Sequence, residues 1–150
     1  MIMSKIRAKD TKPEIKLRKS LFALGFRYRI HVKTLPGTPD IVLKRYKTVI
    51  FVNGCFWHGH SCRKREHAAK SNIEFWDDKI LKNRLRDIQK QLQLINMGWN
   101  IIIVWECQIK TKRMLESKSL EIAQKLKRRQ TRFYERVPIP DRYDNSSPWV

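Results

Sequence analysis

Two short apolar runs constrain the fold of this chain more than any other feature of its sequence. Residues 48–52 and 101–105 are almost continuously apolar and rich in β-branched side chains, which is typical of strands covered on both faces. Between them, apolar residues recur at steps of three and four over residues 73–97, and Gly98 follows. That spacing predicts a long amphipathic helix that ends at the glycine.

Two further helices are expected near the ends of the chain. Thr11 and Glu14 have the spacing of a capping box, and the apolar pattern behind them stops at Gly25. Residues 114–129 form a second, strongly basic amphipathic segment. Helices therefore flank the buried strands on both sides in sequence.

The remaining strands are expected early in the chain. Residues 26–32 alternate between apolar and basic side chains, as in a half-buried strand. Residues 41–43 follow a proline-rich turn and should form a hairpin with the apolar run that comes next. Helices interleaved with such strands predict an α/β fold, a mixed central sheet with helices on both faces. We expect a single domain over residues 1–130 and an irregular tail over residues 131–150.

The charge of the chain indicates a polyanionic partner. Its 150 residues contain 33 Lys and Arg against 14 Asp and Glu, a formal net charge of +19. Nucleic acid fits best, because each phosphate neutralised by a basic side chain releases a counterion and adds affinity. A ribosome-associated basic protein and a peripheral membrane binder are the alternatives that charge alone leaves open.

The location of the protein is expected to be intracellular. No run of apolar residues is long enough to span a bilayer, and residues 1–10 lack the apolar stretch of a secretory signal. The chain has 3 cysteines, an odd number that argues against a disulfide framework. These thiols are therefore expected to have another role.

A short stretch rich in cysteine and histidine suggests a metal site. Two thiols and two imidazoles occur within eight residues, and thiolate with neutral imidazole is the ligand set of tetrahedral zinc. Cys107, just past the second buried strand, is a candidate fourth ligand, and four protein ligands would make the site structural. The spacing leaves open whether His58 or His60 is the ligand, and the other histidine would be available for acid-base work. Ordinary buried thiols are the alternative. The stretch reads Cys55-Phe56-Trp57-His58-Gly59-His60-Ser61-Cys62.

A carboxylate at the start of a strand suggests a second metal site. Asp40 follows Pro39 and precedes the apolar residues 41–43, where two strands of a hairpin begin to splay apart. Such a position suits Mg²⁺, which binds one or two carboxylates together with substrate phosphate. Alone, however, an Asp after proline is usually a turn former, and Glu14 is equally explained by the capping box.

Aromatic side chains in a polar, basic loop form a third signal. Phe56, Trp57 and Trp76 lie in or beside this loop, where large apolar side chains would be costly unless they pack against something. Proteins that unstack base steps in DNA use such side chains as wedges. Packing of Trp76 in the core and shielding of the metal by Phe56 are the alternatives, and the core alternative fits Trp76 better than Phe56 and Trp57 together.

Several motifs resemble those of the very-short-patch-repair (Vsr) endonucleases, in the same order along the chain. The resemblance covers about residues 6–107 and leaves the last third uncovered. The motifs are Ile6-Arg7-Ala8-Lys9-Asp10-Thr11-Lys12-Pro13-Glu14, Leu35-Pro36-Gly37 with Pro39-Asp40-Ile41-Val42-Leu43, Val49-Ile50-Phe51-Val52-Asn53-Gly54-Cys55-Phe56-Trp57-His58-Gly59-His60, Glu74-Phe75-Trp76, and Gly98-Trp99 with Val104-Trp105-Glu106-Cys107.

The resemblance implies a restriction-endonuclease-like fold and Mg²⁺-dependent nicking 5′ to the thymine of a T·G mismatch, the product of 5-methylcytosine deamination. It implies that Asp40 and the backbone carbonyl of Val52 bind Mg²⁺ and that Glu14 holds metal-bound water. His58 would be the catalytic histidine. It further implies a structural zinc site of Cys55, His60, Cys62 and Cys107, and an aromatic wedge of Phe56, Trp57 and Trp76 in the base stack beside the mismatch.

The partners that follow are double-stranded DNA with a T·G mismatch and mismatch-repair proteins, with the enzyme acting as a monomer in the bacterial cytoplasm at the nucleoid. One residue departs from the pattern, because Asn53 stands where the family usually has histidine. An amide cannot act as a general base, so either His58 suffices or the activity is altered. A nuclease that ignores mismatches and a non-catalytic zinc module that binds nucleic acid are the competing hypotheses.

Overall fold

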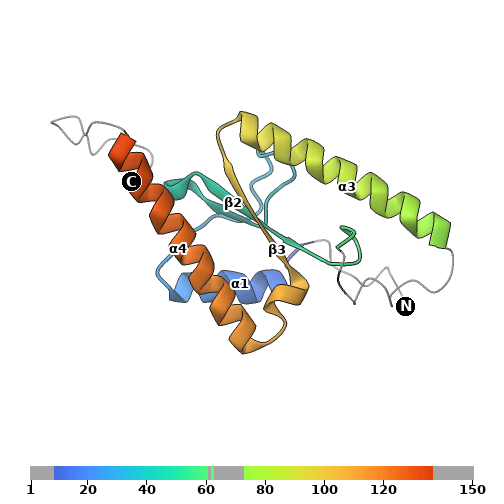
Figure 1. Ribbon diagram of the computed structural model, residues 1–150, viewed down its shortest axis with the longest axis horizontal. Helices are drawn as coiled ribbons and strands as arrows, with labels where there is room; N and C mark the ends of the chain where they lie inside the picture. Colours follow the sequence, from blue (N-terminus) through green and yellow to red (C-terminus); the bar gives the residue numbers. More distant parts are fainter. Residues whose placement is uncertain (1–8, 61, 63–72, 137–150) are drawn as a thin grey trace.

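The computed structural model describes residues 9–60, 62 and 73–136 of the chain. Helices and strands alternate along this part of the sequence, with two short 3-10 helices between them (Figure 1). In chain order the elements are α1 (Lys12–Ala23), β1 (Ile41–Leu43), η2 (Lys44–Tyr46), β2 (Thr48–Asn53), α3 (Ile73–Asn96), β3 (Asn100–Trp105), η3 (Glu106–Ile109) and α4 (Lys112–Arg136).

The strands form a mixed sheet in the order β1-β2-β3, which confirms the predicted α/β class. β1 and β2 are antiparallel, with Ile41 opposite Ile50, as the predicted hairpin requires. β2 and β3 are parallel, with Thr48 opposite Asn100 and Asn53 opposite Trp105. A parallel pair needs a long connection, and α3 lies within it.

Helices cover both faces of the sheet (Figure 1). α1 and α4 pack on one face, and the C-terminal part of α3 packs on the other. Alternate residues of β2 pack into the cores on the two faces of the sheet, because successive side chains in a strand point to opposite faces. Ile50 and Val52 belong to the core under α1 and α4, whereas Val49 contacts the smaller core that includes Leu94 of α3.

The predicted strand over residues 26–32 is wrong within the described structure. Only Arg29 pairs with the sheet, where its N–H and C=O each form a 2.9 Å hydrogen bond with Val42. His31 adopts a φ of 54°. A left-handed residue ends an extended run, so the alternating pattern cannot continue into the sheet.

Two predicted helices differ from the structure in detail. α3 is confirmed as a helix, but most of the apolar residues that define it are exposed, and only Ile80 and Leu94 are buried. α4 continues to Arg136, beyond the expected residues 114–129, while residues 137–150 lie outside the described part. Within that part, no helix combines the length and the apolar character that crossing a bilayer would need.

Candidate active site and metal centre

Asp40 lies at the point where the pairing of β1 with β2 ends. Its Oδ2 accepts a 2.6 Å hydrogen bond from the backbone N–H of Val52, two residues beyond the last β1 partner, Ile50. Burial raises the pKa of Asp40 to about 7, opposed by the Val52 N–H and reinforced by the nearby negative charge of Glu14. The folded chain therefore holds a carboxylate whose charged form calls for a cation.

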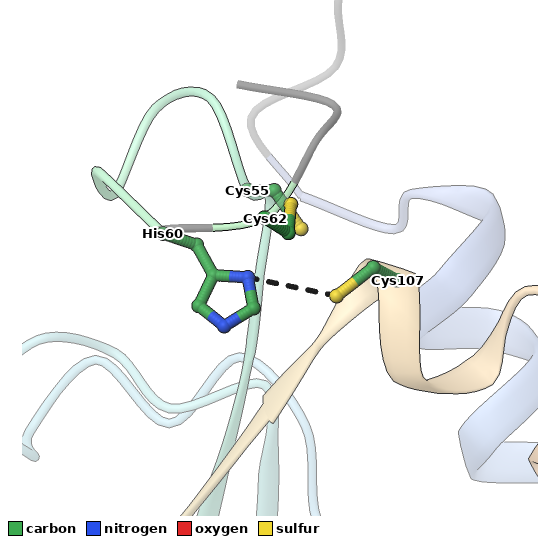
Figure 2. A group of neighbouring side chains, drawn as sticks. All are labelled: Cys55, His60, Cys62 and Cys107. Atoms are coloured by element: carbon green, nitrogen blue, oxygen red, sulfur yellow. Dashed lines mark hydrogen bonds between the residues drawn. The ribbon is translucent and has the colours of Figure 1, made fainter. Parts of the chain in front are cut away.

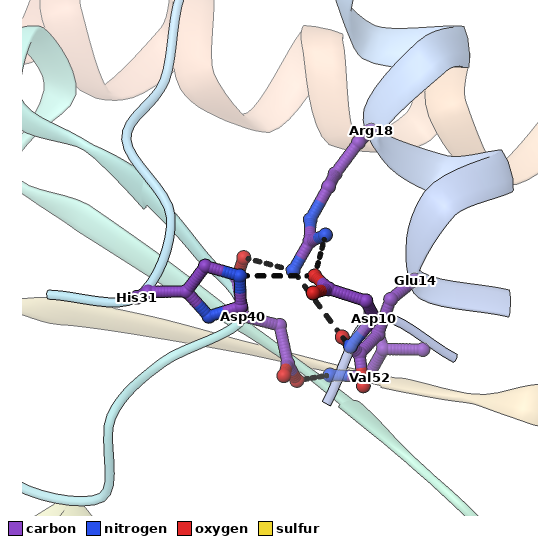
Figure 3. A network of polar contacts seen from close by, with 6 residues as sticks. All are labelled: Asp10, Glu14, Arg18, His31, Asp40 and Val52. Atoms are coloured by element: carbon purple, nitrogen blue, oxygen red, sulfur yellow. Dashed lines mark hydrogen bonds and ion pairs between the residues drawn. The ribbon is translucent and has the colours of Figure 1, made fainter. Parts of the chain in front are cut away.

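Arg18 of α1 connects the backbone of Asp40 to two further carboxylates (Figure 3). Its guanidinium lies 2.6 Å from Asp10 and 3.2 Å from Glu14, and it donates a 3.2 Å hydrogen bond to the backbone carbonyl of Asp40. The Arg18 guanidinium is also the main cause that lowers the pKa of Asp10. The same Asp10 carboxylate lies 3.0 Å from His31. The start of α1 is thereby fixed against the start of β1.

Glu14 is buried, and its position differs in one respect from the predicted capping box. Its carboxylate accepts a 2.8 Å hydrogen bond from the backbone N–H of Asp10, one residue before the N-cap, and Thr11 makes no side-chain cap. The reason is that Arg18 lies one turn further along the helix and holds the same Glu14 oxygen. Glu14 thus bridges the helix start and Arg18.

His58 forms a pair with a residue that the sequence analysis missed. Its Nδ1 lies 2.5 Å from Oδ2 of Asp87 in α3. When Asp87 is ionised, it keeps a proton on Nδ1 and leaves Nε2 as the nitrogen that can exchange a proton. A signal was present, because Asp87 lies seven residues after Ile80, on the face of α3 that packs against the protein. A carboxylate on such a face needs a partner.

These groups line one cavity of about 610 Å³. Asp40, Glu14, Asp87, His58 and the buried Asn53 all contribute to its wall. Basic side chains outnumber the carboxylates around it, which favours an anionic ligand such as a phosphodiester. The basic residues are Lys9, Arg18, Lys33, Arg86 and Lys90.

A separate cluster of thiol and imidazole groups lies beside the cavity. One donor atom from each of its four residues lies within 4.8 Å of all the others, so the group could hold a metal ion. The edge of a tetrahedral site with sulfur ligands is about 3.8 Å, so only small side-chain shifts would be needed. Figure 2 shows His60 directed toward Cys107, with Nδ1 and Sγ 3.5 Å apart. This Cys/His cluster comprises Cys55, His60, Cys62 and Cys107.

The Cys/His cluster joins the ends of two neighbouring strands. Cys55 and Cys107 each lie two residues past the paired ends of β2 and β3. Burial raises the pKa of the Cys55 thiol to about 12, with the neighbouring thiols adding to the shift, and burial also raises the pKa of Cys107. Without a cation, burial favours the protonated thiols. A bound cation would instead favour the thiolates, because it stabilises their negative charge. His60 stacks on Trp105 with 4.2 Å between the ring centroids.

Three aromatic residues named from the sequence pack against one another. The ring centroids of Phe56 lie 5.3 Å from those of both Trp57 and Trp76, and the two tryptophans are 5.8 Å apart. Phe56 is buried, whereas Trp57 and Trp76 are half-buried. The ammonium group of Lys79 lies 5.5 Å from the Trp57 ring. This aromatic cluster is therefore exposed on one side, next to a cation.

Comparison with known proteins places this chain in a class of DNA-cutting enzymes. Residues 1–64 match the family model described as DNA mismatch endonuclease Vsr. The chain is 48% identical over 126 residues to the type II nicking enzyme V.NmeAIP of Neisseria meningitidis, covering 84% of this chain and 89% of that protein. It is 39% identical over 118 residues to the DNA mismatch endonuclease Vsr of Escherichia coli, covering 79% and 75%.

A third relative, the type II nicking enzyme V.XorIIP of Xanthomonas oryzae, is 44% identical over 117 residues, covering 78% of this chain and 85% of that protein. The class is thus that of endonucleases. The chain belongs to the DNA mismatch endonuclease Vsr family, as its motifs suggested.

Proposed function

We propose that the protein is a Mg²⁺-dependent endonuclease that nicks DNA 5′ to the thymine of a T·G mismatch. The observation that carries the proposal is the cavity, in which a buried carboxylate with a raised pKa, a second carboxylate and a histidine paired with aspartate share one basic pocket. These are the groups that metal-assisted phosphodiester hydrolysis requires. A restriction-endonuclease-like fold is part of the same proposal.

Asp40 and Val52 would hold the Mg²⁺ ion. Strand geometry supports this pair, because the N–H and C=O of one residue leave a strand on the same side. The N–H of Val52 points to Asp40, so its carbonyl oxygen leaves β2 on the Asp40 side, past the last residue that β1 pairs. Both donors are oxygens, the type that Mg²⁺ prefers, and Glu14 would accept hydrogen bonds from water around the ion. Bound there, Mg²⁺ would stabilise negative charge on the phosphate and lower the pKa of water.

His58 would transfer a proton through Nε2 during cleavage. Asp87 keeps the ring in one orientation and one tautomer, which is the usual role of a carboxylate behind a catalytic histidine. Asn53 is buried in the same wall and can only donate or accept hydrogen bonds, so it would position a phosphate oxygen. His31 also lines the cavity, but its partner is Asp10.

The two remaining clusters would shape the enzyme around the DNA. Zn²⁺ would fit the Cys/His cluster, since three thiols and one imidazole are a common ligand set of structural zinc. The aromatic cluster would enter the base stack beside the mismatch, where a distorted step costs less to open. Its exposed tryptophan faces and the adjacent ammonium group of Lys79 suit contact with a base and a phosphate.

The partner would be double-stranded DNA containing the mismatch, with mismatch-repair proteins acting on the same lesion. One chain supplies every group of the cavity, so one copy would suffice for each nick. Repair of chromosomal DNA would place the protein in the bacterial cytoplasm, at the nucleoid.

The test compares two labelled duplexes of one sequence that differ only in T·G against T·A. We expect a single nick 5′ to the mismatched thymine, dependent on Mg²⁺ and abolished by EDTA. Equal cutting of both duplexes would instead identify a mismatch-independent nuclease, as the nicking-enzyme names of several relatives would allow. Binding without any cutting in Mg²⁺ or Mn²⁺ would identify a non-catalytic zinc module.

A further inference from the structure

His31 lines the same cavity as Asp40 and His58, and the proposed function leaves it without a role. Its side chain is 32% exposed, so a ligand in the cavity can reach the ring. Nε2 of His31 lies 3.0 Å from Oδ1 of Asp10. Asp10 therefore engages Nε2 and leaves Nδ1 as the nitrogen that can exchange a proton.

One guanidinium group links this histidine to the start of β1. Nη1 of Arg18 lies 2.6 Å from the same Asp10 oxygen that pairs with His31. Nη2 of Arg18 donates a 3.2 Å hydrogen bond to the backbone carbonyl of Asp40 (Figure 3). Because Arg18 is buried and has partners on both sides, it fixes the pair of Asp10 and His31 relative to Asp40.

The backbone also brings His31 to this edge of the sheet. Arg29 forms an isolated antiparallel bridge with Val42, and in antiparallel pairing the residues two steps further on approach one another again. Two steps from this bridge are His31 on one segment and Asp40 on the other. His31 and Asp10 both have a φ of 54°, which residues other than glycine rarely adopt. Such conformations persist where the surrounding structure holds them, often at functional sites.

Hydrolysis of a phosphodiester requires two proton transfers, one from the attacking water and one to the oxygen of the departing alcohol. The proposed function names a single group for this work, His58, and the carboxylates of the cavity are assigned to the ion and to His58. The amide of Asn53 has no acid-base chemistry, and arginine side chains stay protonated. Lysine ordinarily keeps its proton up to about pH 10, whereas imidazole exchanges protons near neutral pH. Among the residues that line the cavity, His31 is the group suited to the second transfer.

We propose, on the basis of the proposed function, that His31 is a second catalytic histidine, which donates a proton from Nδ1 to the departing oxygen. The water oxygen bonds to phosphorus while the bond between phosphorus and the departing oxygen breaks. Nε2 of His58 takes the proton of the water, and the departing oxygen takes the Nδ1 proton of His31. Exchange with solvent then restores both rings. Arg18 is the main cause that lowers the pKa of Asp10, so Asp10 stays ionised and stabilises the imidazolium of His31 before the step.

A duplex with sulfur in place of the departing oxygen tests this role. The oxygen substrate and the sulfur substrate both carry the T·G mismatch and differ only in the bridging atom at the bond that is cut. Thiols are far stronger acids than alcohols, so a thiolate departs without receiving a proton. Loss of a general acid should therefore slow cutting of the oxygen substrate alone, whereas a structural defect should slow cutting of both.

Two variants remove the proton donor in different ways. In His31→Gln the amide can still donate to Asp10, and in His31→Asn the new residue tolerates the left-handed backbone. For each we expect the single-turnover rate to fall by about 10²–10⁴-fold on the oxygen substrate and by less than about threefold on the sulfur substrate. Affinity for the duplex should stay within about twofold, because the proton transfer belongs to the transition state.

His58→Ala should slow cutting of both substrates, because His58 acts on the water rather than on the departing group. The matched control is Arg29→Gln, at an exposed position of the same segment that does not line the cavity. It should leave the ratio of the two rates as it is in the wild type.

Equal losses on both substrates in both His31 variants would overturn the proposal and make His31 a structural residue. An undiminished rate on the oxygen substrate would also overturn it, because water would then supply the proton. Losses on the oxygen substrate alone in His58→Ala, with losses on both in the His31 variants, would reverse the two roles. Each of these results leaves the proposed function intact, whereas a wild type that cuts neither duplex overturns both.

Discussion

Asp40 is held in a position that disfavours its own charge. Burial and the neighbouring Glu14 raise its pKa, so ionisation costs stability in the folded protein when no cation is present. The folded value of about 7 lies above the unfolded value, so this cost begins above about pH 4 and is complete above about pH 7. Binding of a divalent cation should therefore strengthen as pH rises through 7.

We expect Asp40→Asn to abolish nicking while leaving duplex affinity within about twofold, because it removes a metal-binding charge and spares the basic surface. In Mg²⁺-free buffer the variant should be more stable than the wild type at pH 8, by roughly 1–3 kcal/mol, and equally stable near pH 4. Thermal unfolding at the two pH values measures this. Asp78→Asn, at an exposed carboxylate, is the control. Mg²⁺-dependent nicking by Asp40→Asn would remove Asp40 from the metal site.

Asp87 sets the tautomer of His58, so its role can be tested without removing the imidazole. In Asp87→Asn the new amide can donate to Nδ1, which would move the proton to Nε2 and block its use as a base. We expect the single-turnover nicking rate to fall by about 10²–10⁴-fold with duplex affinity unchanged.

His58→Ala should lose at least as much activity, and combining the two substitutions should add little, because both disable one unit. Additive losses would mean that His58 and Asp87 act independently.

At the scale of elements, the Cys/His cluster connects the loop after β2 to the 3-10 helix after β3. We expect Cys107→Ser to lower both zinc content and stability, because binding energy at a structural metal site is also folding energy. A 100-fold loss of metal affinity corresponds to about 2.7 kcal/mol. Elemental analysis and thermal unfolding report the two quantities. Lys110→Ser, at an exposed position three residues further on, should change neither. Full zinc occupancy in Cys107→Ser would exclude Cys107 as a ligand.

The aromatic cluster joins the loop after β2 to the first turns of α3. Trp57→Ala should weaken binding to a T·G duplex more than binding to the matched duplex, by roughly 1–3 kcal/mol, because a wedge contributes most where the step opens easily. Fluorescence anisotropy with both duplexes measures the difference. Phe22→Ala, at an exposed aromatic of α1, should affect neither. Equal weakening on both duplexes would assign Trp57 to the fold instead.

The elements that the sequence predicted well are those whose pattern reflects burial on the sheet. The runs in β2 and β3 are largely apolar because α1, α3 and α4 cover the faces of the sheet. Burial on both faces can therefore be predicted from the local sequence. The prediction of a strand over residues 26–32 was wrong because an alternation of apolar and basic side chains is also compatible with an extended segment. Here that segment has a single bridge to the sheet, at Arg29. The prediction for α3 differed in another way, since its apolar face is not the face that packs on the described part of this chain.

The candidate site was predictable wherever a motif held its members close in sequence. The Cys/His cluster and the aromatic cluster depend largely on one stretch after β2, and the structure brings their members together. Asp87 and Arg18 were missed because their partners, His58 and the Asp40 carbonyl, are 29 and 22 residues away. Such pairs form only when the helices pack on the sheet, so the spacing of residues in the sequence does not predict them.

At the scale of the whole molecule, basic side chains around the cavity should determine the affinity for duplex DNA without affecting the discrimination between mismatched and matched duplexes. Lys33→Gln removes one cation from the cavity wall, so it should weaken both T·G and T·A duplexes alike. The slope of log affinity against log salt should become less steep by about 1. Lys125→Gln, on α4 and paired with Glu121, should leave the slope unchanged. A loss confined to the mismatched duplex would instead mean that Lys33 contacts the lesion.

The segment from Asn53, the last residue of β2, to His60 contributes to two sites at once. Asn53 and His58 line the cavity, while Cys55 and His60, interleaved with them, belong to the Cys/His cluster. On the proposed assignment, a newly synthesised chain would have His58 in place only after its thiols had captured zinc. Maturation would then act as a safeguard for the genome, because a nuclease still short of zinc would be unable to break the DNA that surrounds it.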